Sequence, residues 1–198
     1  MAAYALPPCM VSLRRKHPGI SIELVPSNEM SDLTRREAAI AIRHKRPEQP
    51  DLVAKRIDDI EISLFASAEY LDAFGPADSL ADFSGANFIG FQHPDRLVSQ
   101  VTAMGISVTR ENCGITATTG SAMYELVREG AGIAFLPIIV AEGRLGLQRI
   151  LPEAPSFKIE TWLVTHHEIQ TSRRIRLTFD HIAEFLAKDR WSGLIARI

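Results

Sequence analysis

The sequence predicts an α/β fold in which a mostly parallel sheet carries helices on both faces. The main observation is that segments patterned as strands alternate with segments of helical period along nearly all of the 198 residues. The composition, with 46% hydrophobic and 23% charged residues, is that of an ordinary globular protein. A chain of this length buries enough surface to hold a core without a disulfide or a metal.

The first third of the chain begins with a helix over residues 6–17. Pro7 and Pro8 suit its first turn, where a missing N–H costs little, and Pro18-Gly19 ends it. Residues 20–25 alternate apolar and polar side chains, which predicts a strand. The remaining elements expected here are a short helix at 33–37 and strands at 38–42, 52–57 and 60–66, with a polar loop over 43–51 that contains Pro47 and Pro50.

The rest of the chain continues the alternation. Helices are expected at 68–74, 80–83, 96–104, 122–129, 137–142 and 173–188, and strands at 87–91, 113–118, 133–136 and 157–165. The last helix is the clearest, because Ile175, Phe179, Ile182 and Leu186 form one apolar stripe at helical spacing.

The formal net charge of −2 lacks the basic excess of a self-sufficient nucleic-acid binder. Basic clusters occur at Arg14-Arg15-Lys16 and Arg173-Arg174-Ile175-Arg176, which we interpret as solvated helix faces. Cys9 and Cys113 form no CxxC pair and are expected to be free thiols. The start resembles no secretory signal, and no apolar run reaches the roughly 18 residues of a membrane helix, so we expect a soluble cytoplasmic protein.

Several segments, in order, resemble the C-terminal effector-binding domain of LysR-type transcription regulators. They are Leu6-Pro7-Pro8, His17-Pro18-Gly19-Ile20, Arg36 to Arg43 (REAAIAIR), Leu64 to Leu71 (LFASAEYL), Leu126 to Pro137 (LVREGAGIAFLP), and Arg173 to Leu186. The stretch ending at Pro137 is the most specific. Ala39 departs from the family pattern, where an Asp is common.

This resemblance implies two Rossmann-like lobes joined by two crossover strands, as in type 2 periplasmic binding proteins. Lobe I is expected at residues 1–66 plus 165–198 and lobe II at 67–164. The family's N-terminal winged helix-turn-helix, which contacts DNA, and the first strand of lobe I are expected to be absent from the sequence. One hypothesis is that a neighbouring copy fills the place of that strand.

The resemblance also implies a small effector between the lobes and a homodimer or homotetramer. Three places suit an anion such as a carboxylate, because ligands of open α/β sheets bind beyond the carboxyl ends of strands and at helix N-termini. They are Ser27 and Asn28, then Arg43 and His44, then Thr118, Thr119, Gly120 and Ser121. Phe65, Ala66, Ser67 and Pro137 are candidate pocket walls.

Each candidate has a simpler alternative. Ser27 and Asn28 suit plain N-caps, Arg43 suits a loop salt bridge, and Phe65 suits the core. His166-His167-Glu168 is interpreted as a surface loop and not as a metal site, because adjacent side chains at a strand end point to opposite faces. No metal and no cofactor is expected.

We expect no enzyme, since the chain contains no GxSxG, HExxH, P-loop or GxGxxG motif. Gly130-Ala131-Gly132 is better explained as a helix C-cap. Two alternatives stay open beside the sensor domain. One is a solute-binding protein of a transport system with the same fold, and the other is an enzyme built on that scaffold.

Overall fold

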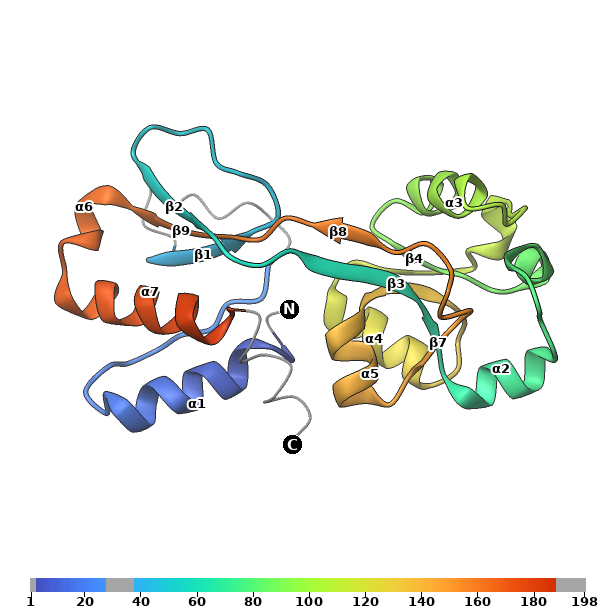
Figure 1. The fold of residues 1–198 in the computed structure, drawn as a ribbon, viewed down its shortest axis with the longest axis horizontal. Helices are drawn as coiled ribbons and strands as arrows, with labels where there is room; N and C mark the ends of the chain where they lie inside the picture. The colour runs from blue at the N-terminus through green and yellow to red at the C-terminus, as the bar shows by residue number, and fades with distance from the viewer. Residues whose placement is uncertain (1–2, 28–37, 188–198) are drawn as a thin grey trace. The chain divides into compact units, whose positions relative to one another are not determined.

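The computed structural model describes residues 3–27 and 38–187. The chain divides into two compact units. Unit 1 is formed by Met1–Ile60 with Lys158–Ile198, and unit 2 by Glu61–Phe157. Strand β3 (Ile60–Ala66) leaves unit 1 at its start, and strand β8 (Phe157–Ile159) returns to it, so two strands connect the units along the chain (Figure 1).

Unit 1 is built on a three-stranded antiparallel sheet in the order β1-β9-β2. Its strands are β1 (Ile40–Arg43), β2 (Leu52–Arg56) and β9 (Trp162–His166). Helices α1 (Leu6–Lys16) and α7 (Arg173–Phe185) pack against each other beside this sheet, and the short α6 (His167–Gln170) joins β9 to α7 (Figure 1).

The two long helices of unit 1 form where their apolar spacing and caps predict. Pro residues occupy the first turn of α1, and the His17 N–H closes its end on the Leu13 carbonyl. Leu13 is fully buried. The predicted stripe of α7 is largely confirmed, since Phe179, Ile182 and Leu186 are buried, and Ile175 is half-buried.

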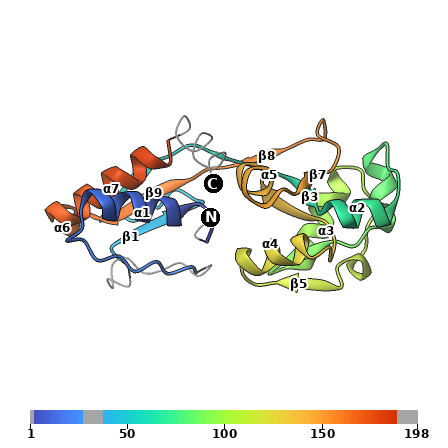
Figure 2. The same ribbon diagram turned by 90° about the horizontal axis from the view of Figure 1, so that it is seen from below.

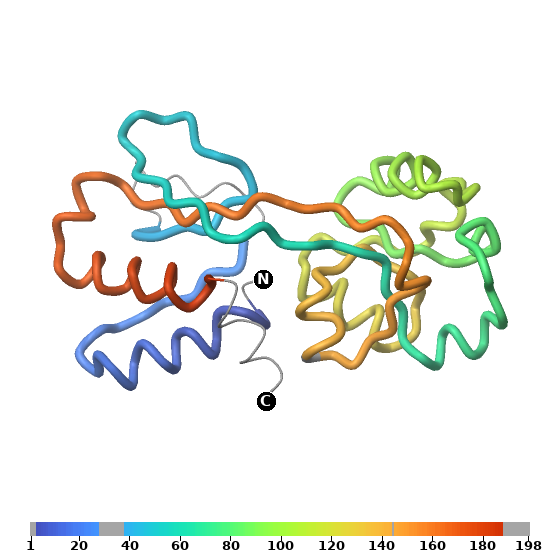
Figure 3. Tube along the Cα trace, viewed as in Figure 1, coloured from blue at the N-terminus to red at the C-terminus, as the bar shows by residue number. Residues whose placement is uncertain are grey.

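Unit 2 contains two small sheets. In the first, β6 (Ala134–Pro137) and β7 (Gln148–Arg149) flank β3, which also pairs with β8. In the second, β4 (Ile89–Phe91) and β5 (Ile115–Ala117) pair in parallel. The helices are α2 (Ala68–Phe74), α3 (Pro94–Ala103), α4 (Gly120–Arg128) and α5 (Ile138–Leu145), with short 3-10 turns at Leu80–Gly85 and Arg110–Asn112. The tube in Figure 3 traces this order from β3 through to β8.

The core of unit 2 joins the two sheets. Its cluster includes Leu64, Phe83, Phe88, Val101, Ile106 and Ile133. An isolated parallel bridge between Phe88 and Ile133 brings the start of β4 beside the start of β6. Gly132 is required at this junction, because a Cβ there would lie 2.5 Å from the Asn87 carbonyl oxygen.

The structure corrects several sequence-based expectations. The strand expected at 20–25 is wrong, because that segment pairs with no strand among the described residues; apolar alternation is not enough without a backbone partner. The sheets are not mostly parallel: β4 pairs with β5 in parallel, whereas β9 with β1 and β2, and β3 with β6 and β7, pair antiparallel. The order of helices and strands along the chain does not determine whether neighbouring strands run parallel or antiparallel.

Smaller corrections concern the last third of the chain. The long strand expected at 157–165 is two strands, β8 and β9, with a break between them. The two-residue β7 was not predicted. The helix expected at 33–37 lies outside the described residues. Within the described ranges, no helix is long and apolar enough to cross a membrane.

Candidate functional site

The N-terminus of α4 presents a group of hydroxyls just beyond the end of β5. Thr119 caps the helix, and its Oγ1 accepts a hydrogen bond from the Ala122 N–H at 3.3 Å. The same Oγ1 lies 3.3 Å from the Ser121 hydroxyl. Thr118, Thr119 and Ser121 are all exposed. Because the first N–H groups of a helix lack intrahelical acceptors and lie at the positive end of its dipole, this arrangement suits a small anion.

Gly120 keeps this helix start open. Apart from its chain neighbours and the backbone of its own helix, a Cβ added at Gly120 would meet nothing within 4 Å. A ligand atom can therefore approach the backbone at this point, provided that residue 120 stays small.

The sequence reasoning missed the neighbouring strand end. Strand β4 runs parallel to β5, so Gln92 and His93 emerge at the same edge as Thr118. Gln92 adopts a left-handed backbone, with φ 57, and its N–H donates to the Ala117 carbonyl at 2.9 Å. Both side chains are exposed. The rule that ligands bind beyond the carboxyl ends of strands pointed to this position. The residue types, however, do not indicate that Gln92 adopts a left-handed backbone.

Arg43 and His44 lie at the end of β1 in unit 1. Arg43 is opposite Trp162 in the register of β1 and β9, and it is half-buried and already makes an interaction. His44 is exposed as a residue, yet desolvation of the imidazole lowers its pKa, an effect that a hydrogen bond with the Glu160 backbone partly offsets. Arg43 supplies a positive charge here, and Arg46 supplies another, with its guanidinium carbon 5.5 Å from the centroid of the Trp162 ring.

Of the first candidate pair, Ser27 is exposed and makes an interaction, whereas Asn28 lies outside the described residues. Ser27, Arg43 and His44 belong to unit 1, and the described candidates from Phe65 to Pro137 belong to unit 2.

The candidate wall residues are chiefly core residues of unit 2. Phe65 and Ala66 are fully buried in β3, where Phe65 faces Ala134 and Arg149 across the strands. Ser67 caps α2 by accepting a hydrogen bond from the Tyr70 N–H at 3.2 Å. Pro137 is buried and lies opposite Ile62, about 16 Å along β3 from Ser67 at the usual rise of a strand. The structure therefore places Pro137 apart from the other three.

The His166-His167-Glu168 stretch is a helix start and not a loop, since His167 opens α6. The two imidazole rings are stacked with centroids 4.8 Å apart, so the expectation that they point to opposite faces is wrong, because the strand ends between them. The His167 ring lies 3.1 Å from the Asp51 carbonyl and the His166 Nδ1 accepts from the Glu168 N–H. Over residues 3–27 and 38–187, no group of three His, Cys, Asp or Glu side chains could hold a metal ion.

Two α/β units connected by two strands, with exposed hydroxyls at a helix start beyond a parallel pair, place the chain in the class of type 2 periplasmic-binding-protein-like domains. The family model described as the LysR substrate binding domain matches residues 1–187. The chain belongs to this family.

Individual relatives agree with this assignment. The HTH-type transcriptional regulator CrgA of Neisseria meningitidis serogroup C (strain 8013) is 25% identical over 195 residues, which cover 96% of this chain and 65% of CrgA. The chain thus spans just under two thirds of the length of this relative. The solved CrgA regulatory domain from Neisseria meningitidis is similar with a TM-score of 0.78 and 24% identity, covering 92% of each chain.

A further solved structure is similar in fold. It is the effector binding domain of QuiR in complex with shikimate, with a TM-score of 0.67 and 17% identity, covering 94% of this chain and 92% of that one.

Proposed function

We propose that this chain is the effector-sensing domain of a LysR-type transcription regulator and that its effector is a small carboxylate. The observation that carries the proposal is the exposed hydroxyl group of Thr118, Thr119 and Ser121 at the open start of α4. In a chain of the LysR substrate binding domain family, this helix start supplies hydroxyls, free N–H groups and a favourable field for an anion. Shikimate, the ligand in the QuiR structure, carries a carboxylate of this kind.

Arg43 is the proposed second anchor. Its guanidinium can donate two parallel N–H hydrogen bonds to a carboxylate. Arg43 belongs to unit 1, whereas the α4 start belongs to unit 2. An effector that contacts both units would favour the arrangement of the units to which it binds more tightly. The size of this effect is set by the difference between its affinities for the two arrangements. We propose that residues 1–66 with 165–198 and residues 67–164 act as the two lobes of this sensor.

The remaining parts of the proposal concern the whole regulator. The sensor acts in the cytoplasm without catalysis, in a homodimer or homotetramer. It controls a DNA-binding domain that lies outside this sequence, as the names of the curated relatives support.

A thermal-shift screen tests the ligand class. Small hydroxylated and aromatic carboxylates, shikimate among them, are compared with the matching amides. A ligand that binds only the folded chain at 100 times its Kd adds about 2.7 kcal/mol of stability. We expect carboxylates to raise the melting temperature and their amides to do so far less. Equal stabilisation by an acid and its amide would contradict an anion site.

A further inference from the structure

The two arginine-rich segments of the chain lie together at one end of unit 1. Helices α1 and α7 pack against each other and run in opposite directions (Figures 1 and 2). His181 of α7 faces the Cys9 backbone of α1, and the end of α1 lies beside the start of α7 in both views (Figures 1 and 2). Eight residues onward in α1 and eight residues back in α7 lead to His17 and Arg173. Because both helices rise about 1.5 Å per residue, these positions lie at the same level.

This level carries five exposed cations, which we call the basic end of unit 1. They are Arg15, Lys16, Arg173, Arg174 and Arg176. None of the five forms an ion pair with another described residue. The carboxylates nearest in sequence are Glu168 in α6 and Asp180, one turn beyond Arg176.

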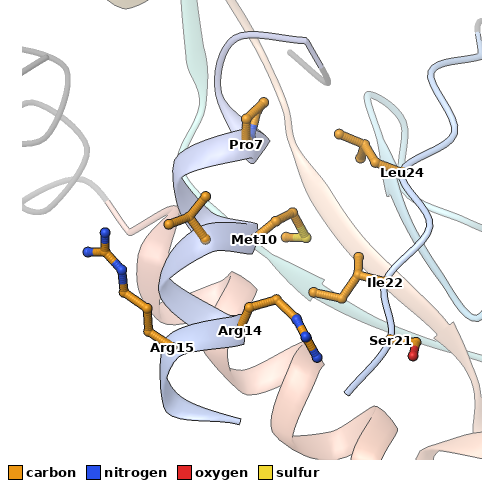
Figure 4. Close-up of a pocket in the computed structure, with 8 residues that line it drawn as sticks. Pro7, Met10, Arg14, Arg15, Ser21, Ile22 and Leu24 are labelled. Atoms are coloured by element: carbon orange, nitrogen blue, oxygen red, sulfur yellow. The ribbon is translucent and has the colours of Figure 1, made fainter. Parts of the chain in front are cut away.

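Arg14 is not counted in this set, because its guanidinium is held within unit 1. It donates to the carbonyls of Pro18 and Ile20 beside the groove between α1 and residues 21–24 (Figure 4). Over residues 3–27 and 38–187, the side chains of the five remaining cations have no such partner, so they are available to an external anion.

Arg15 and Lys16 lie in the last turn of α1, where the helix dipole favours cations, but helix stability does not explain the three arginines of α7. The first turn of α7 contains Arg173, Arg174 and Arg176 and no acidic residue, although the positive end of the helix dipole disfavours cations. Ser172 makes no side-chain cap there, so the first N–H groups of α7 add to the positive field. Such an arrangement is electrostatically unfavourable in the isolated unit and becomes favourable when an anion covers it.

We propose that the basic end of unit 1 binds the phosphate backbone of duplex DNA. Arginine forks match phosphate oxygens bidentately, and evenly spread cations without apolar anchors are typical of a sequence-independent phosphate contact. An acidic protein partner fits less well, because protein interfaces centre on buried aromatic and aliphatic side chains. Of the described large hydrophobic side chains that are exposed, only Val11 belongs to α1 or α7. The overall charge of −2 hides this local excess.

Fluorescence anisotropy of a labelled duplex of mixed sequence, titrated with the 198-residue chain at several salt concentrations, tests the proposal. Each neutralised phosphate contributes about 0.9 to the slope of log K against log salt, so five contacts predict a slope of about −4.5. The triple variant Arg173→Gln, Arg174→Gln, Arg176→Gln is expected to reduce that slope by about 2.7. Arg15→Gln with Lys16→Gln, on the other helix, is expected to reduce it by about 1.8.

The matched control removes three exposed charges elsewhere, by Lys45→Gln, Lys55→Gln and Arg96→Gln, and should keep the wild-type slope. Thermal unfolding checks that each variant is folded. If the triple variant in α7 does not fold, the Arg15→Gln, Lys16→Gln variant in α1 is used in its place. No binding by the wild type at low salt, or equal slopes in the wild type and both patch variants, would overturn the proposal. So would competition by polyglutamate as effective as by unlabelled duplex. No effector is present, so the sensing role is tested separately.

Discussion

His181 of α7 is hydrogen-bonded to the backbone of Cys9 in α1, while its ring nitrogen Nε2 is buried without a hydrogen-bond partner among the described residues. This contact lies where helix α7 packs against helix α1. The His181 ring, which charges near physiological pH, is buried there, and electrostatic interactions with Lys16, His17 and Glu184 act on its pKa.

The protein should therefore lose stability as the solution becomes acidic. The pKa of His181 is lowered below 6.5, first because burial desolvates the ring and then because Lys16 repels its charged form. The unfolded chain binds the proton first, so the contribution is intact above about pH 6.5 and is lost as the pH falls through the lower folded value. Urea unfolding from pH 7.5 to 5 measures this. We expect His181→Gln to flatten the pH dependence, and an unchanged profile would contradict the assignment.

Gly132→Ala should destabilise unit 2 strongly. Gly132 has φ 149, and an added Cβ would lie 2.5 Å from the Asn87 carbonyl oxygen, the same oxygen that accepts the Ile133 N–H. Backbone strain and the lost contact together should cost about 2–3 kcal/mol. The control is Gly114→Ala, where a Cβ meets nothing within 4 Å, and its stability should stay within about 0.5 kcal/mol of the wild type. Equal denaturant midpoints for the two variants would show that the junction is not constrained.

Thr119→Ala should affect both stability and ligand binding. Loss of the hydrogen bond from the Ala122 N–H to Thr119 Oγ1 removes a helix cap, which is worth about 1 kcal/mol. Thr119→Ser keeps the hydroxyl and should restore stability and affinity for the carboxylate found in the thermal-shift screen. If Thr119→Ala lowers the melting temperature and leaves that affinity unchanged, the α4 start is a structural cap only.

Arg43→Ala should weaken binding of the same carboxylate by about 1.5–3 kcal/mol, the range for a hydrogen bond to a charged group. Arg43→Lys keeps the charge but loses the bidentate fork, so an intermediate affinity is expected. Isothermal titration calorimetry measures both variants, with the exposed Lys45→Ala as control. An affinity equal to that of the wild type would leave Arg43 with a purely local role beside Trp162.

Much of the local structure was predictable because it depends on short-range spacing. The helix expected at 68–74 and the strand expected at 60–66 coincide with α2 and β3, since Ser67 caps the one and β-branched and apolar residues fill the other. The open helix start at Thr119 was also predictable, as its cap and Gly120 are adjacent in sequence. Gln92 was not, because its position depends on the pairing of β4 with β5.

The sequence by itself determined the alternation of helices and strands, the helix caps and the family, since each rests on residues a few positions apart. Only the tertiary structure decided that 20–25 lacks a strand partner among the described residues, that most of the described strand pairs are antiparallel, and that the end of α1 lies beside the start of α7 (Figures 1 and 2). These depend on which segments meet across long stretches of chain. The pattern of apolar residues predicts which side chains are buried but not which segment they pack against. The basic end of unit 1 therefore depends on the packing of α1 against α7, which the sequence alone does not predict.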